Sequence, residues 1–119
     1  MALGLIEVYG FTTAILVADR AAKTAPVKVV AIDKNKPANG DAARVPLVMA
    51  VKLEGDVSSV EAAMKAGREE AEKRGLFITE KLIARQSPDV EWFAHLSALG
   101  KDKLRGTSKD TADAGKDQA

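Results

Sequence analysis

The residue types that most often carry catalytic chemistry are scarce in this sequence of 119 residues, which has one histidine, His95, and no cysteine. Without cysteine there are no thiolate nucleophiles, disulfides or cysteine-bound zinc and iron–sulfur clusters. His95 stands close to Trp92 and Phe93, and no second ligand or nucleophile is spaced to meet it. We therefore expect His95 to pack half-buried, and the sequence predicts no catalytic residue, no metal site and no cofactor.

The longest polar stretch within the predicted folded part runs from Lys34 to Arg44 and is followed by Val45 and Pro46. Its Asn-Gly-Asp segment is a turn signal, and two prolines stiffen its ends. A loop of this length in a compact domain is usually functional or mobile. From the residues alone, an ordinary mobile hairpin loop is the favoured interpretation, and a functional loop is the alternative.

The unit that organises the chain is the stretch 45–75, which reads as a strand followed by a helix. The strand is apolar on both faces until Lys52 and Glu54, which we expect to mark its exit to water. Asp56 or Ser58 can cap the helix. A stripe of mostly small residues predicts that the helix lies close on its sheet, and its members are Val60, Met64, Gly67 and Ala71. Acid–base pairs four residues apart follow the other face, which we expect to be solvated: Glu61–Lys65, Glu69–Lys73 and Glu70–Arg74.

The other elements give the order β-α-β-β-α-β. Further strands are predicted at 3–9, 27–33 and 76–84, a first helix at 11–23, and a short helix at 89–96. The first helix is expected to be capped by Thr12 or Thr13 and to bury a stripe of Ile15, Leu16, Ala18 and Ala22. This order predicts an α+β fold, the ferredoxin-like two-layer sandwich, with a short C-terminal helix. Residues 1–100 form the predicted domain, and 101–119 a disordered polar tail.

Composition excludes several classes of function. The formal net charge of +1 is unlike that of a general nucleic-acid binder. No apolar run approaches the length of a membrane helix, and the start has no basic-then-apolar leader. The lack of cysteine makes a reducing cytoplasm the expected compartment. Hydrophobic content is 46% and aromatic content 4%, which predicts a core of small aliphatic side chains and favours self-association.

Several segments in unbroken order resemble the shell domain of bacterial microcompartments, the BMC domain. They are ALGLIE at 2–7 with Gly10, DRAAKTA at 19–25, GDVSSVEAA at 55–63 with Ala66-Gly67, IAR at 83–85 and PDVE at 88–91. The resemblance covers about residues 2–97 and is to the single-domain, hexamer-forming shell proteins.

The resemblance implies a homo-hexamer that tiles into a sheet with other shell proteins around encapsulated enzymes, in the cytoplasm. It places the loop after the second strand at the sixfold axis as a pore loop, whose residues are Asn35, Lys36, Pro37, Ala38, Asn39, Gly40, Asp41 and Arg44. It also places Lys23 and Arg85 at the edge where hexamers meet. Six copies of Asp41 and Arg44 near an axis would form rings of opposite charge that select among small solutes.

The loop departs from the common family pattern, a very short loop containing glycine and serine. Its greater length resembles that of atypical shell proteins of glycyl-radical-type compartments. Some of those carry a loop cysteine that can hold an iron–sulfur cluster, which this cysteine-free chain does not have.

The same architecture also hosts regulators, enzymes and RNA binders. An oligomeric ferredoxin-like regulator that binds a small molecule is the main alternative, because its ligand loops could mimic 34–46. An acylphosphatase-like hydrolase needs an arginine-bearing phosphate loop near the first strand, and residues 7–10 contain no arginine and one glycine. An RNA-binding sheet needs paired exposed aromatics on its central strands, and the strands offer little beyond Tyr9 and Phe77.

Overall fold

A computed structural model describes residues 1–35 and 47–97, and the structural statements below concern that part of the chain. The elements are β1 (Ala2–Tyr9), α1 (Phe11–Thr24), β2 (Lys28–Asn35), β3 (Val48–Gly55), α2 (Val57–Glu72), β4 (Phe77–Ile83), the 3-10 helix η2 (Pro88–Val90) and α3 (Glu91–Ala94). The predicted α+β class and β-α-β-β-α-β order are confirmed.

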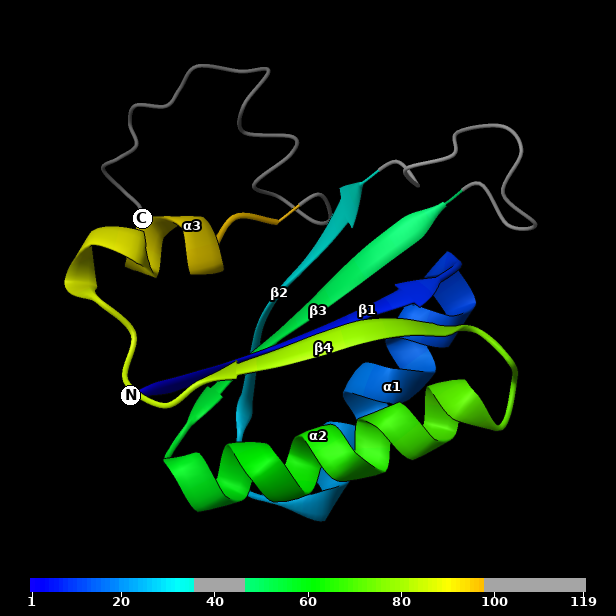
Figure 1. The fold of residues 1–119 in the computed structure, drawn as a ribbon, viewed down its shortest axis with the longest axis horizontal. Helices are drawn as coiled ribbons and strands as arrows, with labels where there is room; N and C mark the ends of the chain where they lie inside the picture. The colour runs from blue at the N-terminus through cyan, green and yellow to red at the C-terminus, as the bar shows by residue number, and fades with distance from the viewer. Residues whose placement is uncertain (36–46, 98–119) are drawn as a thin grey trace, which may run out of the picture.

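The four strands form one antiparallel sheet in the order β2-β3-β1-β4. At one end of the sheet Ala2 pairs with Gly55, and at the other Tyr9 pairs with Val48. Helices α1 and α2 cover one face, and α3 lies on the opposite side (Figure 1). Within residues 1–35 and 47–97, no helix is long and apolar enough to cross a membrane.

The core lies between the sheet and the two long helices. The largest fully buried side chains are small or medium-sized aliphatic groups, as the composition predicts: Ile6, Met49, Leu53, Val8, Val17, Val51 and Val60. All four residues of the predicted α2 stripe are buried. Burying each such valine or leucine side chain is worth about 1.5–3 kcal/mol.

The predicted buried stripe and cap of α1 are mostly wrong. Its buried residues are Thr13, Ala14, Val17, Ala18 and Ala21. Ile15 is 40% exposed, because the helix turns its alanines and Val17 toward the closely packed α2. The N-cap is Gly10 at φ 91°, without a side-chain cap, and this positive φ favours glycine where β1 turns into the helix.

Helix α2 begins at Asp56, one of the two caps that the sequence predicted. The Asp56 side chain accepts a hydrogen bond of 2.9 Å from the Ser59 backbone N–H. This bond lowers the pKa of the Asp56 carboxyl below its usual range, with smaller effects from the Ser58 and Ser59 hydroxyls. At the other end, Gly75 takes a positive φ of 69° and Leu76 N–H bonds to the Ala71 carbonyl at 3.1 Å, closing the helix.

The expectation that Lys52 and Glu54 mark an exit to water is wrong. Lys52 is 3% and Glu54 8% exposed. The physical reason is that the chain beyond β4 returns across this side of the sheet, where Phe93 and His95 contact the two charges. No pattern within the strand indicated that a later segment covers these two residues.

Candidate functional site

The two stems of the predicted pore loop are held at one end of the sheet. Asn35, at the end of β2, pairs with Val48, at the start of β3. Lys34 N–H donates to Asp33 Oδ1 at 2.9 Å, and the side chains of Lys34 and Asn35 are exposed. Gly10 N–H donates to the Leu47 carbonyl at 2.8 Å, so the second stem is tied to the turn between β1 and α1.

Only the first of the predicted pore-loop residues, Asn35, is described. The others lie outside the described residues: Lys36, Pro37, Ala38, Asn39, Gly40, Asp41 and Arg44. The structure therefore fixes where this loop leaves and re-enters the sheet.

Lys23 lies in the last turn of α1, where a cation interacts favourably with the helix dipole. Its side chain is 76% exposed and its Nζ lies 2.8 Å from Asp19 Oδ2. An exposed ion pair of this kind contributes about 0.3–0.5 kcal/mol. Lys23 is therefore available for contact with another molecule.

Arg85 follows β4 and is exposed. Its neighbour Gln86 is buried, and the Gln86 backbone N–H donates to the Met1 carbonyl at 3.2 Å. The chain is thus fixed immediately after Arg85, which orients this segment relative to the start of β1.

Pore-loop stems and predicted edge residues lie at opposite ends of the sheet. Ile83 pairs with Leu3 at the end where β1 begins, and Arg85 follows Ile83. Helix α1 starts at the other end, beside the loop stems, and runs back to Lys23 before β2 begins at Lys28. The structure brings Lys23 and Arg85 to one end and Asn35 to the other.

A charge network holds the second half of α1 against α2. Arg20 contacts Glu69 at 3.2 Å and the largely buried Glu70 at 3.3 Å. Glu70 also pairs with Arg74 at 2.9 Å and Lys73 at 3.2 Å. The hydrogen bond from Arg74 lowers the pKa of Glu70 most; burial opposes it, and Lys73 and Arg20 lower it further. The network fixes the turn of α1 that leads to Lys23.

This network corrects the expected solvated face of α2. Of the three predicted pairs, Glu70–Arg74 is formed, but Glu70 is buried between the helices and has three basic partners. The helix-spacing pattern predicted the local pair. The pattern did not predict the contact of Glu70 with Arg20, which lies 50 residues away in the sequence.

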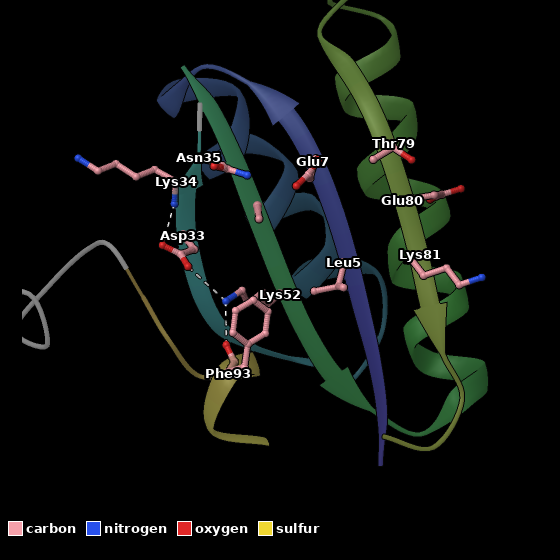
Figure 2. Close-up of a pocket in the computed structure, with 11 residues that line it drawn as sticks. Leu5, Glu7, Asp33, Lys34, Asn35, Lys52, Thr79, Glu80, Lys81 and Phe93 are labelled. Carbon is pink, nitrogen blue, oxygen red and sulfur yellow. Dashed lines mark hydrogen bonds and ion pairs between the residues drawn. The ribbon is translucent and has the colours of Figure 1, made fainter. Parts of the chain in front are cut away.

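The sheet face opposite the long helices carries a hollow of about 590 Å³ (Figure 2). All four strands and α3 contribute to its lining, which mixes charged and apolar groups: Leu5, Glu7, Asp33, Lys34, Asn35, Ala50, Lys52, Thr79, Glu80, Lys81 and Phe93. Lys52 is the best-coordinated charge there, because its Nζ donates to the Phe93 carbonyl at 3.0 Å and lies 3.5 Å from Asp33 Oδ2.

The Lys52 ammonium in the hollow is held in structural hydrogen bonds. In the described part of the chain, no group of three or more His, Cys, Asp or Glu residues is placed to hold a metal ion. His95 lies outside the hollow's lining, and its Nε2 is 3.1 Å from Glu54 Oε2.

Sequence reasoning missed Lys52, Glu54 and Gln86 as residues with a structural role. Gln86 Nε2 donates to Glu54 Oε2 at 2.6 Å, joining the segment that follows β4 to β3. The available signal was the placement of two opposite charges on one face of an otherwise apolar strand. Such charges are rarely at the centre of a sheet unless they are paired.

Comparison with known proteins gives consistent matches. A family model described as the BMC domain matches residues 2–86. The bacterial microcompartment shell protein PduK of Salmonella typhimurium is 39% identical over 88 residues, which is 74% of this chain and 50% of PduK. The shell protein EutK of Escherichia coli is 36% identical over 91 residues, which is 76% of this chain and 49% of EutK.

A solved structure of a microcompartment protein from Desulfitobacterium hafniense has the same fold. It superimposes with a TM-score of 0.64 at 33% identity, covering 76% of this chain and 47% of that one. The chain spans about half the length of the curated relatives that it matches.

Proposed function

Because this chain belongs to the BMC-domain family, we propose that it is a structural shell protein of a bacterial microcompartment. In this proposal it forms cyclic hexamers, which tile edge to edge into a protein sheet in the bacterial cytoplasm. Its partners are its own copies, other shell proteins and the enzymes that the shell encloses. The chain itself performs no catalysis.

One observation carries the proposal: the BMC domain matches residues 2–86, which include all four strands and both long helices. The match is therefore to the whole sandwich and not to one motif. Relatives named as shell proteins, PduK and EutK, align over 74% and 76% of this chain.

For the pore, we propose that the loop between β2 and β3 lines the sixfold axis. The fixed stems at Asn35 and Leu47 support this role, because they present the loop at one end of the sheet. Six copies of Asp41 and Arg44 would then place rings of opposite charge around a small opening. Such rings favour small polar solutes of suitable charge.

For the hexamer edge, we propose Lys23 and Arg85. Both are exposed and both lie at the end of the sheet away from the loop stems, as a rim contact requires. The stem of a lysine can lie flat on apolar surface while its ammonium finds carbonyl groups. Arginine donates a planar fork of hydrogen bonds to acceptors across a seam.

Native mass spectrometry tests the hexamer, and electron microscopy of concentrated protein tests the tiling. We expect a particle with the mass of six chains, and sheets or tubes at high concentration. A chain that stays monomeric at high concentration would overturn the proposal. A dimer or trimer that binds a nucleotide would favour the ferredoxin-like regulator instead.

A further inference from the structure

The segment 86–97, here called the C-terminal strap, buries few of its own apolar groups. It crosses the sheet on the side away from α1 and α2 (Figure 1). Trp92 is 69%, Phe93 51% and Leu96 47% exposed, whereas Ala94 is the buried apolar residue of α3 at 1%. Hydrophobic burial therefore contributes little to holding this segment in place.

Two buried charges on β3 hold it instead. Lys52 Nζ donates to the Phe93 and Leu96 carbonyls at 3.0 Å each, and lies 4.8 Å from the centre of the Phe93 ring. Its charge is balanced by Asp33 Oδ2 at 3.5 Å. Bonds from an ionised donor are stronger than those between neutral groups. Lys52 thus fastens the far end of the strap.

Glu54 holds the near end of the strap through Gln86 and its far end through His95. Its Oε2 accepts from Gln86 Nε2 at 2.6 Å and lies 3.1 Å from His95 Nε2. Lys52 and Glu54 are two residues apart on one strand, so both point to the same face. A further bond, from Ser97 Oγ to the Ile32 carbonyl at 3.0 Å, reaches the neighbouring strand β2.

We propose that the C-terminal strap detaches from the sheet and binds to it again as one unit, while the rest of the sandwich stays folded. Lys52 and Glu54 hold the strap in its bound position. Release lets water hydrate Lys52 and Glu54, so lost hydrogen bonds are largely replaced and the buried core between sheet and helices is untouched. Segments with few buried apolar contacts are those that open at the lowest free energy.

Binding of the strap to the sheet also shapes the hollow on the sheet face opposite α1 and α2. Lys52 and Phe93 both line the hollow, and the hydrogen bond between them also holds the strap. Figure 2 shows them side by side. When the strap is bound to the sheet, Phe93 forms one wall of the hollow. When the strap is detached, this wall is absent. The position of the strap therefore determines how far the sheet face opposite α1 and α2 is exposed to solvent.

Hydrogen exchange of the full chain, followed by mass spectrometry, tests the proposal. The amides to follow are those of His95 and Leu96, which donate to the Glu91 and Phe93 carbonyls at 3.1 Å each. In Lys52→Met we expect strap exchange to be at least about tenfold faster, since hydrogen bonds to charged groups are worth that factor or more. Exchange in the strands and long helices should not change.

The matched control is Lys81→Met, an exposed lysine of β4 that lines the same hollow. It should leave strap exchange unchanged. Trp92, the only tryptophan of the chain, gives a second readout, because a released strap should lower its fluorescence anisotropy in Lys52→Met.

A second variant covers the possibility that Lys52→Met does not fold. The double change Gln86→Ala with His95→Ala removes both partners of Glu54 from the strap side and leaves β3 intact. It should also speed strap exchange selectively. Strap exchange that is unchanged, or that rises equally across the sheet and helices, in the folded variants would overturn the proposal.

Discussion

Gly67 of α2 and Val17 of α1 lie in such close contact that a Cβ at position 67 would stand 3.0 Å from Val17 Cγ1. The same Cβ would lie 3.1 Å from Ile6 Cδ1 on β1. Helix, helix and sheet therefore meet at a point where only a hydrogen fits comfortably. This is the close approach that the small-residue stripe of α2 predicted.

Replacing Gly67 by valine should destabilise the fold by about 1–3 kcal/mol, since overpacking a close-packed core has costs of this size. Lys65→Val is the control at an exposed position of the same helix. Valine is a poorer helix former than lysine but a better one than glycine, so helix propensity alone would make the Gly67 variant the more stable of the two. Urea denaturation would give both values. A Gly67→Val protein as stable as the unmodified one would mean that the close approach at Gly67 has no cost for a larger side chain.

The sandwich was predictable because its signals are local and repeated. The α2 stripe of Val60, Met64, Gly67 and Ala71 and the cap at Asp56 all lie within one helix. The predicted buried stripe of α1 was displaced by about one residue along the helix, because Ile15 is large and apolar yet exposed. Intrinsic hydrophobicity favoured Ile15, whereas the close contact with α2 selected alanines and Val17.

Long-range polar contacts were not predictable in the same way. The partners of Lys52 are the carbonyls of Phe93 and Leu96, which are 41 and 44 residues away. No periodicity within β3 indicates that a later segment will cover this face. The pore-loop and edge residues of the candidate site came from the family resemblance, and their roles stay predictions.

Acidification should weaken the network that joins α1 to α2. The pKa of Glu70 is lowered in the folded protein, so its contribution is complete above the ordinary value of 4.5 and is lost as the pH falls below that value through the folded one. Glu70→Gln should therefore lower the Tm at pH 7. The difference in Tm between this variant and the unmodified protein should become smaller at acid pH. Thermal unfolding at a series of pH values measures this.

Glu61→Gln, at an exposed position of α2, controls for a general loss of negative charge. It should change the Tm little at any pH, since surface charges contribute about 0–1 kcal/mol. A Glu70→Gln gap that stays constant from neutral to acid pH would contradict the assigned role of the Glu70 carboxylate.

Lys23→Ala should abolish sheets while leaving hexamers and folding intact. The change removes an exposed cation whose intramolecular partner is Asp19, so the stability of one chain should fall by no more than about 0.5 kcal/mol. Asp19→Ala breaks the same ion pair but keeps the lysine, and should still form sheets. Electron microscopy and native mass spectrometry separate the two effects. Hexamers that fall apart in Lys23→Ala would show that Lys23 is not at the outer edge.

The absence of native cysteine makes the pore-loop position directly testable by cross-linking. In Asn39→Cys, a sixfold axis would bring the new thiols of neighbouring copies together, and disulfides form when Cα atoms come within about 4.4–6.8 Å. We expect covalent dimers on a non-reducing gel after mild oxidation. Glu61→Cys, on the exposed side of α2, serves as the control and should stay monomeric on that gel. Cross-linking at position 61 but not at 39 would place α2, and not the loop, nearest the axis.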